Sequence, residues 1–276
     1  MIGKVKRAIE IVKEFTKELK KQNISAHAGS SAFFIFVSLL PMLIMLCTIL
    51  PFTPLTEGDL LRAVTDITPD LMDPLAAGLV REVYEKSARV LSAAAVATLW
   101  SAGKGVLALM RGLNDINNTE EKRTYLIVRI MASGYTLALL FLAIISLVMM
   151  VFGDRVVKEI LLCMPGASGM VSFLFHLRFV AVWFLLTIFF AFIYTHIPDT
   201  KLRFREQFIG AMAAAILWSL FSWGFYLYMG RGPVKGIYGN LSIVIIVMLW
   251  FYFGMYIVFL GACLNCYLKR KYSEGR

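Results

Sequence analysis

The sequence is poor in charged residues. Asp, Glu, Lys and Arg make up 17% of the 276 residues, whereas 59% are hydrophobic. The apolar residues are gathered into runs that are too long for the core of a soluble domain. The scarcity of charge therefore argues against a soluble globular protein and indicates a membrane protein with several spans.

Cysteine and histidine are scarce too, with four and three residues. Cys47, Cys263 and Cys266 lie inside or at the end of apolar runs, so no disulfide framework is expected. Cys263 and Cys266 form a CxxC pair, but a zinc site needs four ligands, and the sequence offers no second pair or nearby histidine. We expect no metal site and no cofactor.

The sequence also lacks the common motifs of hydrolytic enzymes. It contains no GxSxG and no HExxH, and its glycine-rich stretch 229–241 does not have the spacing of a nucleotide-binding loop. Metal-assisted hydrolysis uses clustered carboxylates or histidines, but His27 and His196 are expected at the opposite membrane face from His176. We therefore expect a protein that is not an enzyme.

Six apolar runs are each long enough to cross a membrane as a helix. A hydrocarbon core of roughly 30 Å needs about 20 residues at a rise of about 1.5 Å per residue. The predicted spans cover about residues 28–52, 91–112, 128–152, 177–197, 207–229 and 240–267. The predicted fold class is all-α, a polytopic six-helix bundle that forms one membrane domain over residues 1–276.

Two segments outside the spans complete this architecture. Within residues 1–27, apolar side chains recur at helical spacing opposite lysines, which predicts an amphipathic helix lying in the headgroup plane. Residues 53–90 hold seven acidic and four basic residues and predict a small helical cap. Of the 28 Lys and Arg residues, 18 fall on the side of the two termini. The termini are therefore expected in the cytoplasm and the cap outside it.

The net charge of +10 has two interpretations, nucleic-acid binding and lipid binding. The basic residues cluster beside apolar runs, where they set topology and meet anionic lipid head groups. We expect membrane lipids at the cytoplasmic face and an unidentified solute as partners, and no nucleic acid. One chain does not fix the oligomeric state, so a homo-oligomer is left open.

The stretch 98–115 carries the most informative polar residues. At helical spacing Trp100, Lys104, Arg111 and Asp115 fall on one face. Lys104 lies well inside an apolar run, where a charge is costly and is a candidate functional group. The alternative is a side chain that snorkels to the interface. For Arg111, near the interface, an ordinary anchor and a ligand contact are equally favoured.

Other residues in the spans are candidates to line a shared cavity with Lys104. Pro41 removes a backbone hydrogen bond from the first span and predicts a kink or hinge. Polar side chains on other helices are suited to interhelical contacts or to a polar cavity. The remaining candidates for a substrate path are Ser38, Tyr252, Tyr256, Asn240, which also caps the last helix, and Asn265.

Three stretches resemble the YihY/BrkB family of six-helix bacterial inner-membrane proteins, once labelled ribonuclease BN. They are AHAGSSAFFIFVSLLPMLIML (26–46), LWSAGKGVLALMRGLNDIN (99–117) and IYGNLSIVIIVMLWFYFGMYIVFLGACLNCYL (237–268). This chain has GACLN at 261–265, where the family usually has an acidic residue. The resemblance implies a bacterial inner-membrane protein for which transport or export is suggested and the ribonuclease label is a misassignment.

The predicted function is transport or export of a small anionic or lipid-like solute through a polar cavity in the cytoplasmic membrane. The cavity is expected around the second, first and sixth predicted spans. The alternative is a membrane scaffold or assembly factor that transports nothing. The substitution Lys104→Met separates the two, because a transporter would fold and lose flux, whereas a scaffold would change in stability or assembly without a flux defect.

Overall fold

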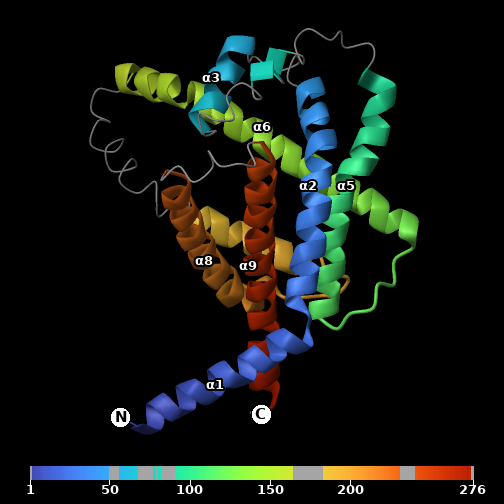
Figure 1. Cartoon of the computed structure of the whole chain (residues 1–276), viewed down its shortest axis with the longest axis vertical. Coiled ribbons are helices and arrows are strands. Elements are labelled where there is room, and N and C mark those ends of the chain that lie inside the picture. The colour runs from blue at the N-terminus through green and yellow to red at the C-terminus, as the bar shows by residue number, and fades with distance from the viewer. Residues whose placement is uncertain are drawn as a thin grey trace. The chain divides into compact units, whose positions relative to one another are not determined.

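The computed structural model describes residues 2–49, 56–67, 77–78, 80–81, 91–163, 183–230 and 240–274, and within them every regular element is an α-helix (Figure 1). The labelled helices are α1 (Ile2–Lys21), α2 (Ile24–Ile49), α3 (Glu57–Ile67), α5 (Leu91–Ile116), α6 (Tyr125–Cys163), α8 (Phe204–Gly230) and α9 (Asn240–Glu274). A further helix covers Trp183–His196. The all-α prediction is confirmed for this part of the chain.

Three of the described helices are long and apolar enough to cross a membrane. The qualifying segments are Tyr125–Leu142 in α6, Phe204–Met229 in α8 and Val244–Tyr272 in α9. Shorter apolar helical segments cover Ile24–Leu39 and Trp183–His196. This set of helices agrees with the prediction of a polytopic membrane protein.

The first span begins inside a helix that starts earlier than residue 28. Asn23 adopts a left-handed conformation with φ 48°, which asparagine tolerates better than most residues. Its N–H donates to the Lys20 carbonyl at 3.3 Å, and its own carbonyl accepts from the Ala26 N–H at 2.9 Å. Asn23 therefore ends α1 and allows α2 to begin at Ile24.

The predicted cap at 53–90 is described only at α3 and at residues 77–78 and 80–81. Thr56 and Asp59 form a reciprocal N-terminal cap on α3. The Asp59 N–H donates to Thr56 Oγ1 at 3.2 Å, and the Thr56 N–H donates to the Asp59 carboxylate at 3.3 Å. The rest of the cap and the glycine-rich connection at 231–239 lie outside the described residues.

The chain divides into two compact units, each built from segments that are far apart in sequence. Unit 1 comprises Met1–Phe36, Gly105–Val128 and Phe179–Arg276, and unit 2 comprises Val37–Lys104 and Arg129–Arg178. Helices α2, α5 and α6 each contribute residues to both units.

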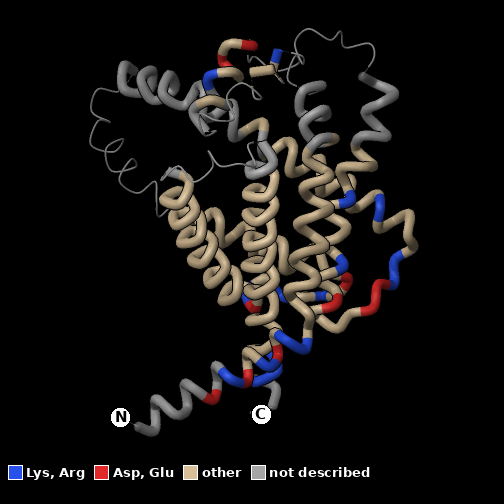
Figure 2. The backbone as a smooth tube through the Cα atoms, viewed as in Figure 1, with Lys and Arg blue, Asp and Glu red and all other residues tan. Residues whose placement is uncertain are grey.

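In unit 1, α8 and α9 pack side by side, and α1 contacts the C-terminal end of α9 (Figure 1). The Glu18 carboxylate accepts two hydrogen bonds from Arg270, at 2.9 and 3.1 Å, and this guanidinium lowers the pKa of Glu18. The Tyr267 hydroxyl donates to Glu14 at 3.0 Å. Figure 2 shows charged residues along α1 and at this end of α9, among other places, whereas α8 and α9 carry none over most of their lengths. Polar contacts therefore bring the two terminal helices together.

Candidate functional site

In unit 2, α5 presents Trp100 and Lys104 on its exposed face. Trp100 is 38% exposed, and the Lys104 side chain is exposed too, whereas Ala102 and Gly103 between them are buried. Lys104 lies 12 residues before the end of the helix at Ile116, roughly 18 Å at about 1.5 Å per residue. The structure therefore places this ammonium near the middle of a 26-residue helix.

The buried side of α5 packs closely on α6 and α2. A Cβ on Gly103 would lie 3.3 Å from Ser133 Oγ of α6, so there is little room for a larger residue there. Ser38 of α2 is buried, and its hydroxyl lies 3.5 Å from the Ser101 carbonyl of α5. Ser38 thus contacts the backbone beside Trp100.

The structure adds Arg129 of α6 to this region of unit 2. The Arg129 side chain is 4% exposed, and its Cζ lies 4.9 Å from the centroid of the Trp100 ring. This distance is typical of a cation–π contact. Arg129 was not among the predicted site residues. Its position inside the apolar run LIVRIM was the signal that distinguishes it.

Arg111 and Asp115 lie further along α5, in unit 1. Both are exposed. Asp115 Oδ2 lies 3.5 Å from Nε2 of His27, which belongs to the first turn of α2. Asp115 thus has a partner on α2, and a role on a solute path remains a prediction for both residues.

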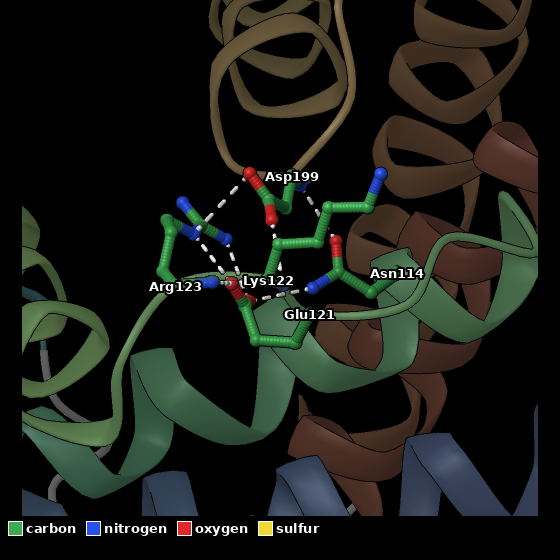
Figure 3. Close-up of polar contacts among 5 residues, drawn as sticks. All are labelled: Asn114, Glu121, Lys122, Arg123 and Asp199. Atoms are coloured by element: carbon green, nitrogen blue, oxygen red, sulfur yellow. Dashed lines mark hydrogen bonds and ion pairs between the residues drawn. The ribbon is translucent and has the colours of Figure 1, made fainter.

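A polar junction joins the end of α5 to two connections of unit 1 (Figure 3). Asn114 donates to Glu121 at 2.8 Å and accepts from the Asp199 N–H at 2.8 Å. The Asp199 carboxylate in turn accepts from the Lys122 N–H at 2.9 Å. Arg123 donates to Glu121 through Nε at 2.6 Å and Nη2 at 2.7 Å. The Arg123 guanidinium holds the pKa of Glu121 below its usual value of 4.5.

This junction predicts a measurable loss of stability in acid. Because the folded-state pKa of Glu121 is lowered, its contribution is present above about pH 4.5 and is lost as the pH falls towards the folded-state pKa. We expect Glu121→Gln to destabilise the chain at pH 7 by about 1 kcal/mol or less. The same substitution is expected to make the unfolding midpoint depend less on pH in acid. Unfolding midpoints across a pH series measure both effects. Glu120→Gln, at an exposed neighbouring position, is the control, and identical pH profiles for Glu121→Gln and the native chain would contradict the prediction.

Asn265, a predicted path residue, lies in the contact between α8 and α9. Its Oδ1 accepts from the Gly210 N–H at 2.7 Å, and its Nδ2 donates to the Gln207 carbonyl at 3.1 Å and side-chain oxygen at 3.0 Å. The Asn265 side chain is 4% exposed. These three hydrogen bonds use the amide to join two helices.

The remaining candidates lie on α2 and α9. Tyr252 and Tyr256 lie one turn apart on α9 with ring centroids 6.2 Å apart. Pro41 lies inside α2, and Asn240 is the first residue of α9. Among the described residues, no group of three or more His, Cys, Asp or Glu side chains is arranged to hold a metal ion.

The comparison with known proteins identifies relatives over nearly the whole chain. The family model described as "Virulence factor BrkB" matches residues 15–276. The Bacillus subtilis (strain 168) protein YfkH, whose name describes it as ribonuclease-like, is 30% identical over 93% of this chain and 96% of its own. A UPF0761 membrane protein of Alteromonas mediterranea is 28% identical over 95% of this chain and 88% of its own.

A further UPF0761 membrane protein, from Mannheimia succiniciproducens, is 25% identical over 92% of this chain and 88% of its own. No solved structure matches the chain. The family match covers both units and the helices α2, α5, α6, α8 and α9, which agrees with the resemblance identified from the three sequence stretches. The chain is an integral membrane protein with several apolar helices, and it belongs to the BrkB family.

Proposed function

We propose that the chain transports or exports a small anionic or lipid-like solute across the bacterial cytoplasmic membrane. The observation that carries this proposal is the Lys104 side chain, which is exposed at the middle of the apolar helix α5. A charge at this depth is expensive in lipid, and intramembrane charges typically face a bundle interior or a water-filled path. The cation of Lys104 favours an anionic solute.

We further propose six spans, with both termini in the cytoplasm. Helices α2, α5, α8 and α9 have at least 26 residues each, about 39 Å or more in length, and α6 has 39 residues. The helix at Trp183–His196 lies within the remaining predicted span. The contacts of Glu14 and Glu18 with α9 bring the terminal helices together. This proximity supports an even number of crossings, and the basic residues on this side support its cytoplasmic location.

The test is release of solutes from proteoliposomes loaded with a pooled extract of cellular metabolites and lipids. We expect at least one anionic or amphiphilic compound to leave vesicles that contain the native chain and to stay in protein-free vesicles. Mass spectrometry of the released material identifies its class. Release of no compound above the protein-free control would contradict transport and favour the scaffold.

Ribonuclease activity, which the name of YfkH suggests, is the competing biochemical function. The sequence lacks the hydrolase motifs named above, and we propose that the chain is not a nuclease. Incubation of the purified chain with end-labelled RNA and divalent cations is therefore expected to leave the RNA intact. Cleavage that copurifies with the folded chain would overturn this part of the proposal.

A further inference from the structure

The guanidinium of Arg129 is buried in unit 2 without a full set of hydrogen bonds. Its side chain is 4% exposed, and neither Nε nor Nη1 has a hydrogen-bond partner among the described residues. An arginine cannot be neutralised by losing its proton, because its pKa is too high. The structure therefore holds a permanent charge, and the described part of the chain leaves two of its three nitrogens, Nε and Nη1, without a hydrogen-bond acceptor.

The Trp100 ring does not supply what these donors need. Its face attracts the cation at 4.9 Å, but an indole has a single N–H donor and no acceptor. Buried donors of a charged group are normally paired with an anion or another acceptor. Within the described part of the chain, Nε and Nη1 of Arg129 therefore favour a negatively charged acceptor.

The guanidinium of Arg129 favours a particular kind of anion. Arg129 is the fifth residue of α6 and lies inside the candidate membrane-crossing segment Tyr125–Leu142. Guanidinium groups bind phosphate strongly, because its several oxygens accept charge-assisted hydrogen bonds.

Lys104 adds a second cation to the same region. It follows Trp100 by one turn of α5, so their Cβ atoms lie about 5–6 Å apart on one face. Its ammonium is exposed, and no carboxylate among the described residues lies within ion-pair distance of it. The Trp100 ring is therefore flanked by a buried cation from α6 and an exposed cation on its own helix.

We propose that Arg129, Trp100 and Lys104 form a binding site for a phosphate group, carried by a lipid headgroup or present as a free anion. This inference rests on the proposed function in taking the exposed face of α5 as the ligand-binding face. Binding does not require flux, so a binding measurement separates its failure from a failure of transport.

The test measures ligand-induced thermal stabilisation of the full chain in a non-ionic detergent. The probes are inorganic phosphate, a short-chain phosphatidylglycerol and, as a carboxylate control, acetate. We expect a phosphate probe to raise the unfolding midpoint of the native chain in a concentration-dependent way. Arg129→Gln is expected to weaken binding at least about tenfold, and Lys104→Met to weaken it less. Arg205→Gln, at an exposed position of α8 in unit 1, is the matched control.

Each outcome of the stabilisation test either supports the phosphate site or overturns it. Stabilisation by inorganic phosphate identifies a soluble anion, and stabilisation by the short-chain lipid alone identifies a headgroup, and both support the site. Arg129→Gln is expected to fold, because it removes an unpartnered charge; if it does not, Lys104→Met at its exposed position carries the test. The site is overturned if neither phosphate probe binds, if acetate binds more tightly, or if the folded variants bind like the native chain.

Discussion

A Gly210→Ala variant is expected to lose about 1–3 kcal/mol of unfolding free energy, or more. A Cβ on Gly210 would overlap the Gly261 carbonyl oxygen of α9 and would lie 2.6 Å from Asn265 Cγ. The carbonyl oxygen belongs to the backbone, so no side-chain rotation relieves the overlap. Helix α8 would have to move away from α9, and the hydrogen bond between Asn265 and the Gly210 N–H would be lengthened.

Gly224→Ala is the matched control, because Gly224 lies in the same helix and a Cβ there would meet nothing within 4 Å. Alanine is a better helix former than glycine by about 1 kcal/mol, so this variant is expected to be neutral or slightly stabilised. Thermal unfolding in detergent, followed by far-ultraviolet circular dichroism, compares the two. Equal midpoints for both variants would show that the close approach of α8 to α9 is not as the structure has it.

The long helices α2, α5, α6, α8 and α9 were predictable because each contains a long apolar run. The sequence predicts a span at 91–112, and α5 covers Leu91–Ile116. It predicts 128–152, but α6 continues to Cys163. Hydropathy indicates where a run of apolar residues ends, whereas a helix continues as long as its backbone N–H and C=O groups form hydrogen bonds along the helix. Helix α6 therefore continues through Asp154 and Arg155.

The contacts between helices were not predictable from one sequence. Gln207 and Asn265 are 58 residues apart, and Asn114 and Asp199 are 85 apart. Periodicity reports the face on which a residue lies, but it does not report which helix meets that face. Asn265 therefore looked like a polar residue available to a solute, and the structure shows its amide bonded to α8.

Arg129 illustrates the opposite case, in which the sequence contained a signal that the prediction did not use. A basic residue near the end of a span is usually an interfacial anchor. Whether it is exposed or buried depends on the neighbouring helix, and here Trp100 of α5 covers it. Burial of this charge became visible only when α5 and α6 were placed together within unit 2.

The effect of Lys104 on flux is the largest functional change that we expect. Lys104→Met keeps a side chain of similar length and removes the charge, so the variant is expected to fold as well as the native chain in lipid. If the ammonium contacts an anionic solute as it crosses, its loss removes a charged interaction of about 1.5–3 kcal/mol. This corresponds to a decrease in rate of at least about tenfold.

Two further variants separate charge from position. Lys104→Arg keeps the cation and is expected to retain much of the rate. Lys201→Met removes a cation from an exposed connection of unit 1 and is expected to leave the rate unchanged. A loss of flux in all three variants would indicate a general effect of substitution rather than a solute path at Lys104.

The initial rate at which the released anionic solute leaves proteoliposomes tests whether Lys104 lies on the solute path. The native chain, Lys104→Met, Lys104→Arg and Lys201→Met are compared at equal amounts of folded protein. We predict at least about tenfold slower release for Lys104→Met alone. Equal rates for the native chain and Lys104→Met would contradict this prediction, because the Lys104 cation would then have no part in moving the solute.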